Sequence, residues 1–467
     1  MAGLGALPFL LALGAASRHR RASASVVCRR LQFAAPITWA FPPLPFPKGL
    51  APAWPRRSPH QQFRLISSLI TCPHEHDTRA VSRATPPYIA RPTPGRHRSS
   101  KDTEQSKETE AMASDSSSNQ AGAAAKPKPK PPPLPLSVRL QLTGLTVAID
   151  AVERRDGTVN RCLYGVIDRL LSARANPKPD ASGVRSLDFT MDASRGMWAR
   201  VFAPATADRP LPVVVYYHGG GFALFSPAIG PFNGVCRRLC AALDAVVVSV
   251  NYRLAPEHRW PAAYDDGVDA LRFLDARGGV PGLDDDVPVD LGSCFLAGES
   301  AGGNIVHHVA NRWAAAWQPS ARTLRVAGVF PVQPYFGGVE RTPSELALEG
   351  VAPVVNLRRS DFSWTAFLPV GATRDHPAAH VTDDNADLAE QFPPAMVIIG
   401  DFDPLMDWQR RYADVLRRKG KEVVVAEYPG MFHGFYGFPE LPEATKVLQD
   451  MKAFVDSHRA TPKLADA

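Results

Sequence analysis

An alternation of short apolar runs with longer amphipathic stretches is the feature that most restricts the fold of this chain. The apolar runs are rich in β-branched residues and lie at 212–220, 245–254, 294–300, 326–332, 395–401 and 422–430. Runs of this kind are typical of strands buried on both faces of a mostly parallel sheet. Helical patterns lie between or after them at 262–276, 301–316, 407–419 and 441–458. The alternation predicts a doubly wound α/β domain, preceded by an antiparallel strand pair near 186–203.

Charge separates the first part of the chain from this domain. Residues 1–100 hold fourteen Lys or Arg and two acidic residues, a net +12, whereas the whole chain carries +7. The rest of the chain is therefore at −5 (7 − 12). The basic charge is no argument for nucleic-acid binding by the folded part, and we expect none. Residues 1–111 are expected to be a disordered or transit-like extension, or an untranslated one if translation starts at Met112.

Residues 112–136 predict a linker that joins this extension to the domain. It is rich in Ser and Ala and ends in "KPKPKPPPLPL", a stiff polyproline spacer for which an SH3-type ligand is the alternative. Residues 137–460 are then enough for one large α/β domain. A start near Met112 implies a cytoplasmic protein, whereas a real basic extension allows an organelle. The apolar run at 4–16 is too short to span a bilayer, and a secretory signal, an organelle transit peptide and an artefact of an upstream start codon all fit it. No stable membrane association is expected.

The cysteines and several histidines of the domain lack metal-type spacing. Those considered are Cys162, Cys236, Cys240, Cys294, His258, His307 and His308. Cys236 and Cys240 stand four residues apart on a predicted helix, which favours packing over metal ligation. We therefore expect no metal site and no disulfide framework.

The stretch "GESAG" at 298–302 has the G-x-S-x-G spacing of a sharp turn from strand to helix. Such a turn exposes a serine hydroxyl, here that of Ser300, although many short matches are ordinary turns. In open α/β sheets, ligands bind beyond the carboxyl ends of the strands. Ser300 follows one of the predicted strands and is therefore a candidate nucleophile.

A second loop at a predicted strand end reads "HGGGF" at 218–222. Successive glycines allow the backbone N–H groups to point into one cavity, as in sites that hold the oxyanion of an acyl-transfer reaction. A phosphate-binding loop would need a following Lys-Ser/Thr, which is absent. Gly220, Gly221 and Ala301 are the predicted oxyanion donors.

Asp403 and His433 supply the remaining parts of a catalytic triad. A serine hydroxyl needs a base that takes its proton and a carboxylate that orients the base. Both residues follow predicted strands, and the chain order Ser300, Asp403, His433 is that of α/β hydrolases. Taken singly, Asp403 is as well explained as a helix cap and His433 as a structural loop histidine. Their joint occurrence predicts a triad.

With these motifs in place, the chain resembles the hormone-sensitive-lipase-like branch of α/β hydrolases, and within it plant carboxylesterases related to gibberellin receptors. The motifs are HGGGF at 218–222, NYRLAPEHRWPAAYDD at 251–266, GESAGGN at 298–304, GDFDPLMDWQ at 400–409 and YPGMFHGFY at 428–436. The resemblance covers about 137–458. It implies hydrolysis of carboxylic esters without a cofactor, with Ser300 attacking the acyl carbon and His433 relaying the proton. It also favours Asp403 over Asp401 and Asp407 as the acid.

The resemblance further implies a cap over the site, built from residues 137–175 and 335–371. Aromatic residues that could line an acyl or alcohol pocket are Phe222, Tyr335, Phe336, Trp364 and Phe367. We predict Phe222, Tyr335 and Trp364 as substrate-binding residues. Packing within the core or the cap is an equally good explanation for each.

The alternative function is that of a hormone-binding protein. Gibberellin receptors look like this fold and keep the serine, but have an apolar residue in place of the catalytic histidine. This chain has His433, which favours a hydrolase of small or short-acyl esters. An interfacial lipase has less support, because the domain lacks a long apolar lid stretch, and transfer of the acyl group to an alcohol stays open. The sequence does not define the natural ester or the oligomeric state.

Overall fold

Eight strands form one sheet at the centre of the domain. The computed structural model describes residues 128–283, 286–316, 318 and 321–459, so the predictions for 1–111 and for most of the linker lie outside the described residues. The strands are β1 (Val184–Asp192), β2 (Met197–Pro204), β3 (Leu211–Tyr217), β4 (Val246–Asn251), β5 (Val289–Glu299), β6 (Val326–Val332), β7 (Ala395–Gly400) and β8 (Val423–Tyr428). Their order is β1-β2-β4-β3-β5-β6-β7-β8. Only β2 runs antiparallel to its neighbours, β1 and β4, and the remaining pairs are parallel. The predicted α/β fold is confirmed.

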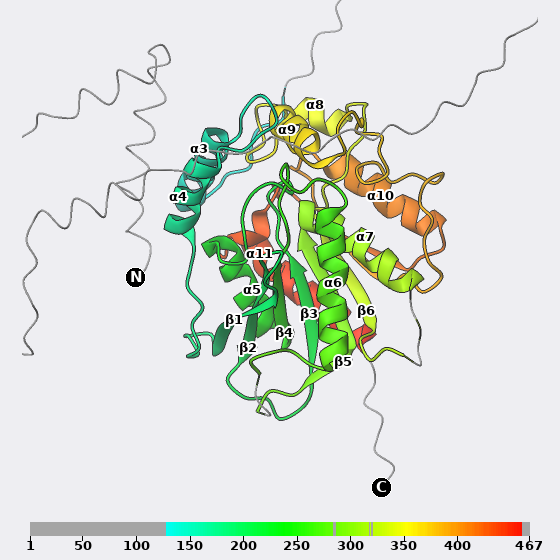
Figure 1. Cartoon of the computed structure of the whole chain (residues 1–467). Coiled ribbons are helices and arrows are strands. Elements are labelled where there is room, and N and C mark those ends of the chain that lie inside the picture. The colour runs from blue at the N-terminus through cyan, green and yellow to red at the C-terminus, as the bar shows by residue number, and fades with distance from the viewer. Residues whose placement is uncertain (1–127, 284–285, 317, 319–320, 460–467) are drawn as a thin grey trace, which may run out of the picture. The chain divides into compact units, whose positions relative to one another are not determined.

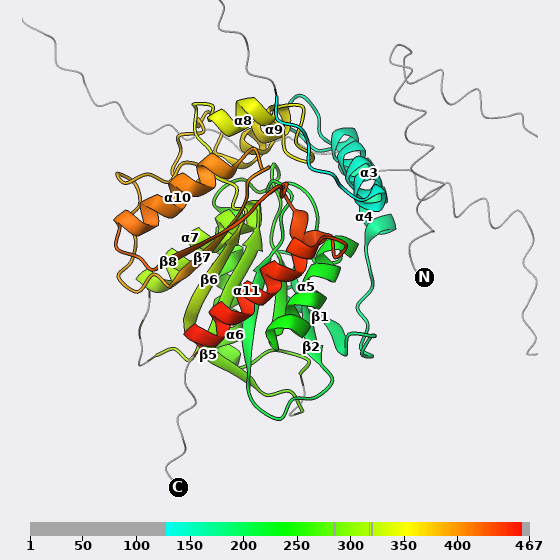
Figure 2. The ribbon, with the colours of Figure 1, turned by 180° about the vertical axis from the view of Figure 1, so that it is seen from behind.

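Helices cover both faces of this sheet. Helices α6 (Ala262–Arg277), α7 (Ala301–Ala315) and α10 (Met406–Arg418) lie on one face, and α5 (Gly230–Leu243) and α11 (Pro442–His458) lie on the other (Figures 1 and 2). Along β3, Val213 and Val215 belong to the core under α6, α7 and α10, whereas Val214 belongs to the core under α5 and α11. Successive side chains of a strand point to opposite faces, so a strand between two cores is apolar at every position.

Strand β8 departs from the prediction that every apolar run is buried on both faces. It is an edge strand that pairs with β7 alone in the sheet order, and Val424 is 43% exposed. Continuous apolarity does not distinguish an edge strand from a central one, because the distinction depends on which strand pairs next to it.

A cap of four helices lies beyond the carboxyl ends of the parallel strands (Figure 1). These helices are α3 (Leu136–Val152), α4 (Arg161–Leu171), α8 (Pro343–Leu348) and α9 (Leu357–Phe367), and α3 begins one residue before the first of the two segments that the resemblance implies for a cap. Side chains define where they begin: Asn160 and Asn356 accept hydrogen bonds from backbone N–H groups of α4 and α9, and Thr342 forms a capping box with Glu345 at α8.

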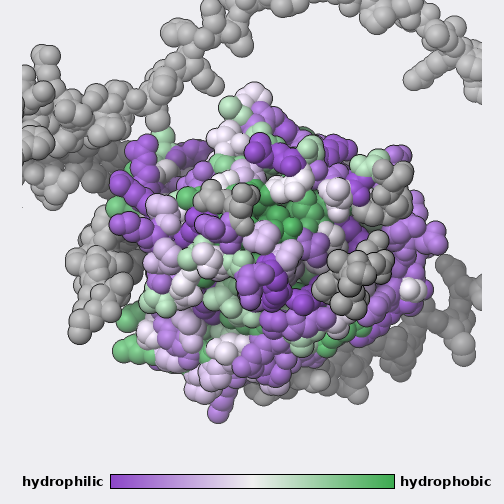
Figure 3. Space-filling view, turned by 90° about the horizontal axis from the view of Figure 1, so that it is seen from below, coloured by the Kyte–Doolittle hydropathy of each residue, from purple (hydrophilic) through white to green (hydrophobic). Residues whose placement is uncertain are grey.

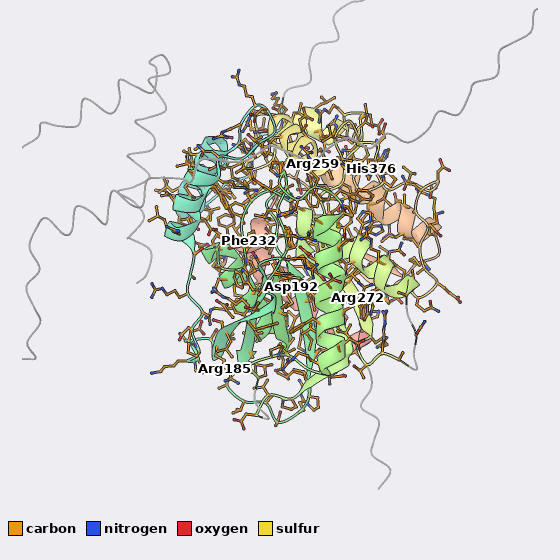
Figure 4. All side chains as sticks on the ribbon, viewed as in Figure 1. Arg185, Asp192, Phe232, Arg259, Arg272 and His376 are labelled. Carbon is orange, nitrogen blue, oxygen red and sulfur yellow. The ribbon has the colours of Figure 1, made fainter. Side chains whose placement is uncertain are left out.

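Ion pairs and hydrogen bonds join the two parts of the cap to each other and to the domain. Arg359 of α9 donates to the Asp150 carboxylate of α3 with both N–O distances at 3.0 Å. At the other end of α9, Arg259 donates to the carbonyl oxygens of Thr365 and Leu368 at 2.6 and 2.8 Å. Figure 4 places Arg259 and His376 at the cap end of the domain and Arg185 at the opposite end. The cap is therefore held over the strand ends from several directions.

The end of the domain that lies opposite the cap has a mainly polar surface. Seen from below, hydrophilic residues cover much of this face, and hydrophobic residues gather near its middle (Figure 3). Within the part of the chain that the structure describes, no helix is both long and apolar enough to cross a membrane.

Candidate active site

Ser300 occupies the sharp turn between β5 and α7. Its backbone has φ 54° and ψ −119°, a conformation that a residue with a side chain rarely adopts. The Ser300 N–H donates to the carbonyl of Val332 at 2.9 Å, and its own carbonyl accepts from the N–H of Tyr335 at 2.8 Å. Close packing also fixes the turn, since a Cβ on Gly302 would collide with the Tyr217 carbonyl. The turn has the geometry that the G-x-S-x-G spacing predicts.

The glycine loop after β3 has three consecutive residues with positive φ, namely Gly220 at 109°, Gly221 at 58° and Phe222 at 62°. Glycine adopts this conformation without steric cost, and at Gly221 a Cβ would also collide with the Ser363 hydroxyl of α9. The loop lies at the carboxyl end of β3, beside β5 and its serine. Ala301, the third predicted donor, begins α7 and is fully buried.

Helix α4 of the cap holds the far side of the same loop. Arg161 donates to the Ala223 carbonyl at 2.8 Å, and the hydroxyl of Tyr164 accepts from the Phe225 N–H at 2.8 Å. Arg161 also contacts the Glu257 carboxylate, with Nε and Oε1 2.9 Å apart. The position of the glycine loop therefore depends on the cap, which the loop sequence alone does not reveal.

Asp403 and His433 form a buried pair between the loops that follow β7 and β8. Nδ1 of His433 and Oδ2 of Asp403 are 2.8 Å apart, and the two residues are 5% and 0% exposed. Burial lowers the pKa of His433, but the Asp403 carboxylate, its hydrogen bond and the nearby Glu299 outweigh it and raise that pKa above 6.5. An acid therefore orients the imidazole and raises its pKa.

The two other aspartates of the loop after β7 are engaged elsewhere. The Asp401 carboxylate is exposed and accepts from the Gly430 N–H. Asp407 lies in the first turn of α10 and accepts from the Ser344 N–H at 2.9 Å. Among the three, Asp403 is the one paired with His433.

Three polar residues near the pair were not predicted from the sequence. Gln333 and Gln409 donate hydrogen bonds to Oδ2 of Asp403, at 3.1 and 2.8 Å. Glu299 lies next to Ser300, and its carboxylate is 3.4 Å from the Tyr216 hydroxyl. Burial raises the pKa of Glu299 to about 7, against the opposing influence of His433 and Tyr216. The sequence signal that could have identified Gln333 and Glu299 is their position, at or just beyond the carboxyl ends of strands.

Four of the five predicted pocket aromatics form one buried cluster. Phe222 stacks on Phe367 with ring centroids 3.7 Å apart, and Tyr335 stacks on Trp364 at 4.4 Å. Each of these side chains is at most 3% exposed. Phe336 packs elsewhere, 4.3 Å from the ring of Tyr412. Packing of these rings against one another explains why they are buried. Contacts of Phe222, Tyr335 and Trp364 with a substrate stay a prediction.

Metal-ligating side chains do not gather in the described part of the chain, where no group of three or more His, Cys, Asp or Glu could hold a metal ion. Cys236 and Cys240 are buried as free thiols on the helix α5, and their spacing of four residues predicts such a helix. His307 is buried as well, with Nδ1 3.1 Å from the Tyr412 hydroxyl.

Comparisons with known proteins agree with this architecture. A family model described as alpha/beta hydrolase fold matches residues 214–437. The chain is 36% identical to gibberellin receptor GID1C of Arabidopsis thaliana, over 68% of this chain and 92% of the relative. It is 35% identical to carboxylesterase 20 of the same plant, over 61% of this chain and 89% of that relative. Among solved structures, an esterase of Pyrobaculum calidifontis is 29% identical with a TM-score of 0.55, covering 70% of this chain and 99% of that one.

The chain therefore belongs to the α/β hydrolases. Within them it falls in the group that contains gibberellin receptors and plant carboxylesterases, as the sequence motifs indicate. It is a carboxylesterase-type α/β hydrolase.

Proposed function

We propose that this protein is a serine carboxylesterase that cleaves small or short-acyl esters with the triad Ser300, His433 and Asp403. The observation that carries the proposal is the buried pair of His433 and Asp403, 2.8 Å apart, at the sheet edge where the Ser300 turn and the glycine loop also lie. A protein that only binds a ligand has no need of a buried acid that orients an imidazole.

The chemistry follows from the roles of these groups. Oγ of Ser300 attacks the acyl carbon while Nε2 of His433 takes its proton, and Asp403 stabilises the imidazolium that forms. The N–H groups of Gly220, Gly221 and Ala301 hold the oxyanion. The alcohol then leaves with the proton from His433, and water, deprotonated by the same imidazole, hydrolyses the acyl-enzyme.

The buried aromatic cluster is the reason for proposing a small substrate. Four aromatic rings, those of Phe222, Tyr335, Trp364 and Phe367, pack together beside the glycine loop and leave each other almost no exposed surface. A compact acyl group fits next to such a cluster better than a long chain does. We therefore expect activity to fall as the acyl chain lengthens.

Hormone binding is the second candidate, favoured by the 36% identity to a protein named as a gibberellin receptor. The two candidates differ in what they need from His433. A hydrolase needs its imidazole as a base, whereas a binding pocket is independent of proton transfer.

The test is hydrolysis of p-nitrophenyl acetate, butyrate and octanoate by the full chain and by Ser300→Ala. Ser182→Ala is the matched control, because Ser182 is exposed and lies before β1. We expect turnover that Ser300→Ala abolishes and Ser182→Ala preserves, highest for acetate. A folded wild-type protein without Ser300-dependent turnover would refute the proposal and direct attention to binding of a small-molecule hormone.

A further inference from the structure

We infer that Gln333 is a positioning residue for the triad. One short segment at the end of β6, which contains Gln333, links the nucleophile, the acid and the base. The inference rests on the proposed hydrolase function. It comes from hydrogen bonds that join three loops far apart in the chain.

The backbone of this segment touches the nucleophile and the neighbouring strand. Val332, the last residue of β6, accepts the Ser300 N–H at 2.9 Å. The N–H of the next residue, Gln333, donates to the Ile398 carbonyl of β7 at 2.8 Å. Gln333 has φ 40°, in the left-handed region that residues with side chains rarely adopt. Such a backbone is kept only where the surroundings hold it firmly.

The side chain of Gln333 reaches the acid and both sides of the base. Nε2 donates to Oδ2 of Asp403 at 3.1 Å and to the Phe432 carbonyl at 3.2 Å. Oε1 accepts from the Gly434 N–H at 2.7 Å. Phe432 and Gly434 flank His433 in the chain, so one carboxamide holds the histidine loop at two points. Gln333 is 1% exposed, so these hydrogen bonds form away from bulk solvent, where a buried polar group needs a partner.

A neutral carboxamide suits this place better than other side chains. It offers two donors and an acceptor, which match the Asp403 carboxylate, the Phe432 carbonyl and the Gly434 N–H. Its Nε2 shares Oδ2 of Asp403 with Nδ1 of His433, which spreads the negative charge over several donors. The Asp403 carboxylate therefore raises the pKa of His433 by less than it would if it faced the imidazole alone.

Gln409 contacts the acid in a different way. Its Nε2 donates to Oδ2 of Asp403 at 2.8 Å, but within the described residues its Oε1 has no hydrogen-bond partner. Gln409 therefore touches the acid without holding the histidine loop, whereas Gln333 does both. The positioning role belongs to Gln333.

The experiment compares Gln333→Met, Gln333→Glu and Asn311→Leu in the full chain. Asn311 on α7 is a matched control, because its carboxamide also bonds at both ends, to the Asp387 carbonyl and the Ala389 N–H, away from the triad. Melting curves and circular dichroism check folding. The readouts are kcat and KM for p-nitrophenyl acetate from pH 5 to 10, and the titration of His433 followed by NMR with ring-labelled histidine, assigned with His433→Asn.

For Gln333→Met we expect kcat to fall by about a hundredfold with KM little changed, because the base is misplaced while binding is not. The pKa of His433 rises, since Asp403 has lost a competing donor. A protonated glutamate can still donate to Asp403 and accept from Gly434. Gln333→Glu therefore keeps more activity than Gln333→Met at low pH. It loses this activity as the glutamate ionises at higher pH, so its profile of kcat against pH has a descending limb that the wild type lacks. Asn311→Leu changes neither kcat nor the titration of His433.

Several outcomes overturn the inference. One is a folded Gln333→Met with wild-type kcat and an unchanged His433 titration. Another is failure of both Gln333 variants to fold while Asn311→Leu folds, which assigns Gln333 to stability alone. Absence of Ser300-dependent turnover in the wild type refutes the proposed hydrolase instead. In that case the His433 titration still decides whether Gln333 acts on the pair of His433 and Asp403.

Discussion

Asp403 and His433 lie thirty residues apart in the chain, yet Oδ2 of the carboxylate and Nδ1 of the imidazole are 2.8 Å apart in the buried interior. Each residue follows a different strand, β7 or β8, and these two strands are parallel neighbours. Their loops therefore emerge at the same edge of the sheet. An ionised carboxylate can only accept, so Nδ1 carries the proton of this bond and Nε2 is free to act as the base.

Asp403→Asn should lower kcat by about 10³ to 10⁴, because the amide no longer fixes the tautomer in which Nε2 accepts a proton. The loss should be smaller than that of Ser300→Ala or His433→Ala, and a residual rate should be measurable with p-nitrophenyl acetate. Asp401→Asn is the control, since Asp401 is exposed and bonds to Gly430. A wild-type rate in Asp403→Asn would remove Asp403 from the triad.

The acid limb of kcat/KM should have its midpoint above 6.5. The base must be neutral to take the proton of Ser300, and the net effect of Asp403 and Glu299 raises the pKa of His433 despite its burial. Activity is therefore low below this pKa and rises through it. Glu299→Gln removes one of the negative charges and should move the midpoint to lower pH. A midpoint that stays fixed in that variant would exclude electrostatic coupling between Glu299 and His433.

Glu299 should also give the folded state a specific pH dependence. Burial raises its pKa from 4.5 to about 7, so between these values the folded protein binds a proton that the unfolded chain has released. The free energy of unfolding therefore falls as pH rises through this window, and the loss is complete above about 7. Wild type should lose up to about 3 kcal/mol relative to Glu299→Gln over this range, at 1.36 kcal/mol per pKa unit. Urea unfolding of both proteins at pH 4.5 and 8 measures the difference, and equal changes would contradict the raised pKa of Glu299.

Two glycine substitutions should have opposite effects on stability. Gly302→Ala places a Cβ against the Tyr217 carbonyl, so the serine turn must shift, at a cost of about 1–3 kcal/mol and most of the activity. Gly234→Ala on α5 meets nothing within 4 Å and should raise stability by about 0.4–1 kcal/mol. Thermal melts and esterase assays of both variants check this. Equal stability of the two variants would show that the turn is not closely packed.

Local patterns in the sequence were enough to predict the fold class and the serine turn. The β-branched runs matched all six strands of the parallel part, because a strand between two cores must be apolar on both sides. The G-x-S-x-G spacing predicted the turn at Ser300, because only small neighbours allow the close approach to Tyr217. The chain order of Ser300, Asp403 and His433 identified the three residues as candidates before their positions in space were known.

Tertiary structure alone decided how these residues are supported. The contacts of Gln333 with Asp403 and Gly434 span 70 and 101 residues of sequence, and no local pattern records them. The exposure of Val424 and the raised pKa of Glu299 likewise depend on the order of the strands and on the loops that cover them. Hydrophobic periodicity reports what one segment requires of its immediate surroundings, whereas partners, pKa values and edges arise when distant segments pack together.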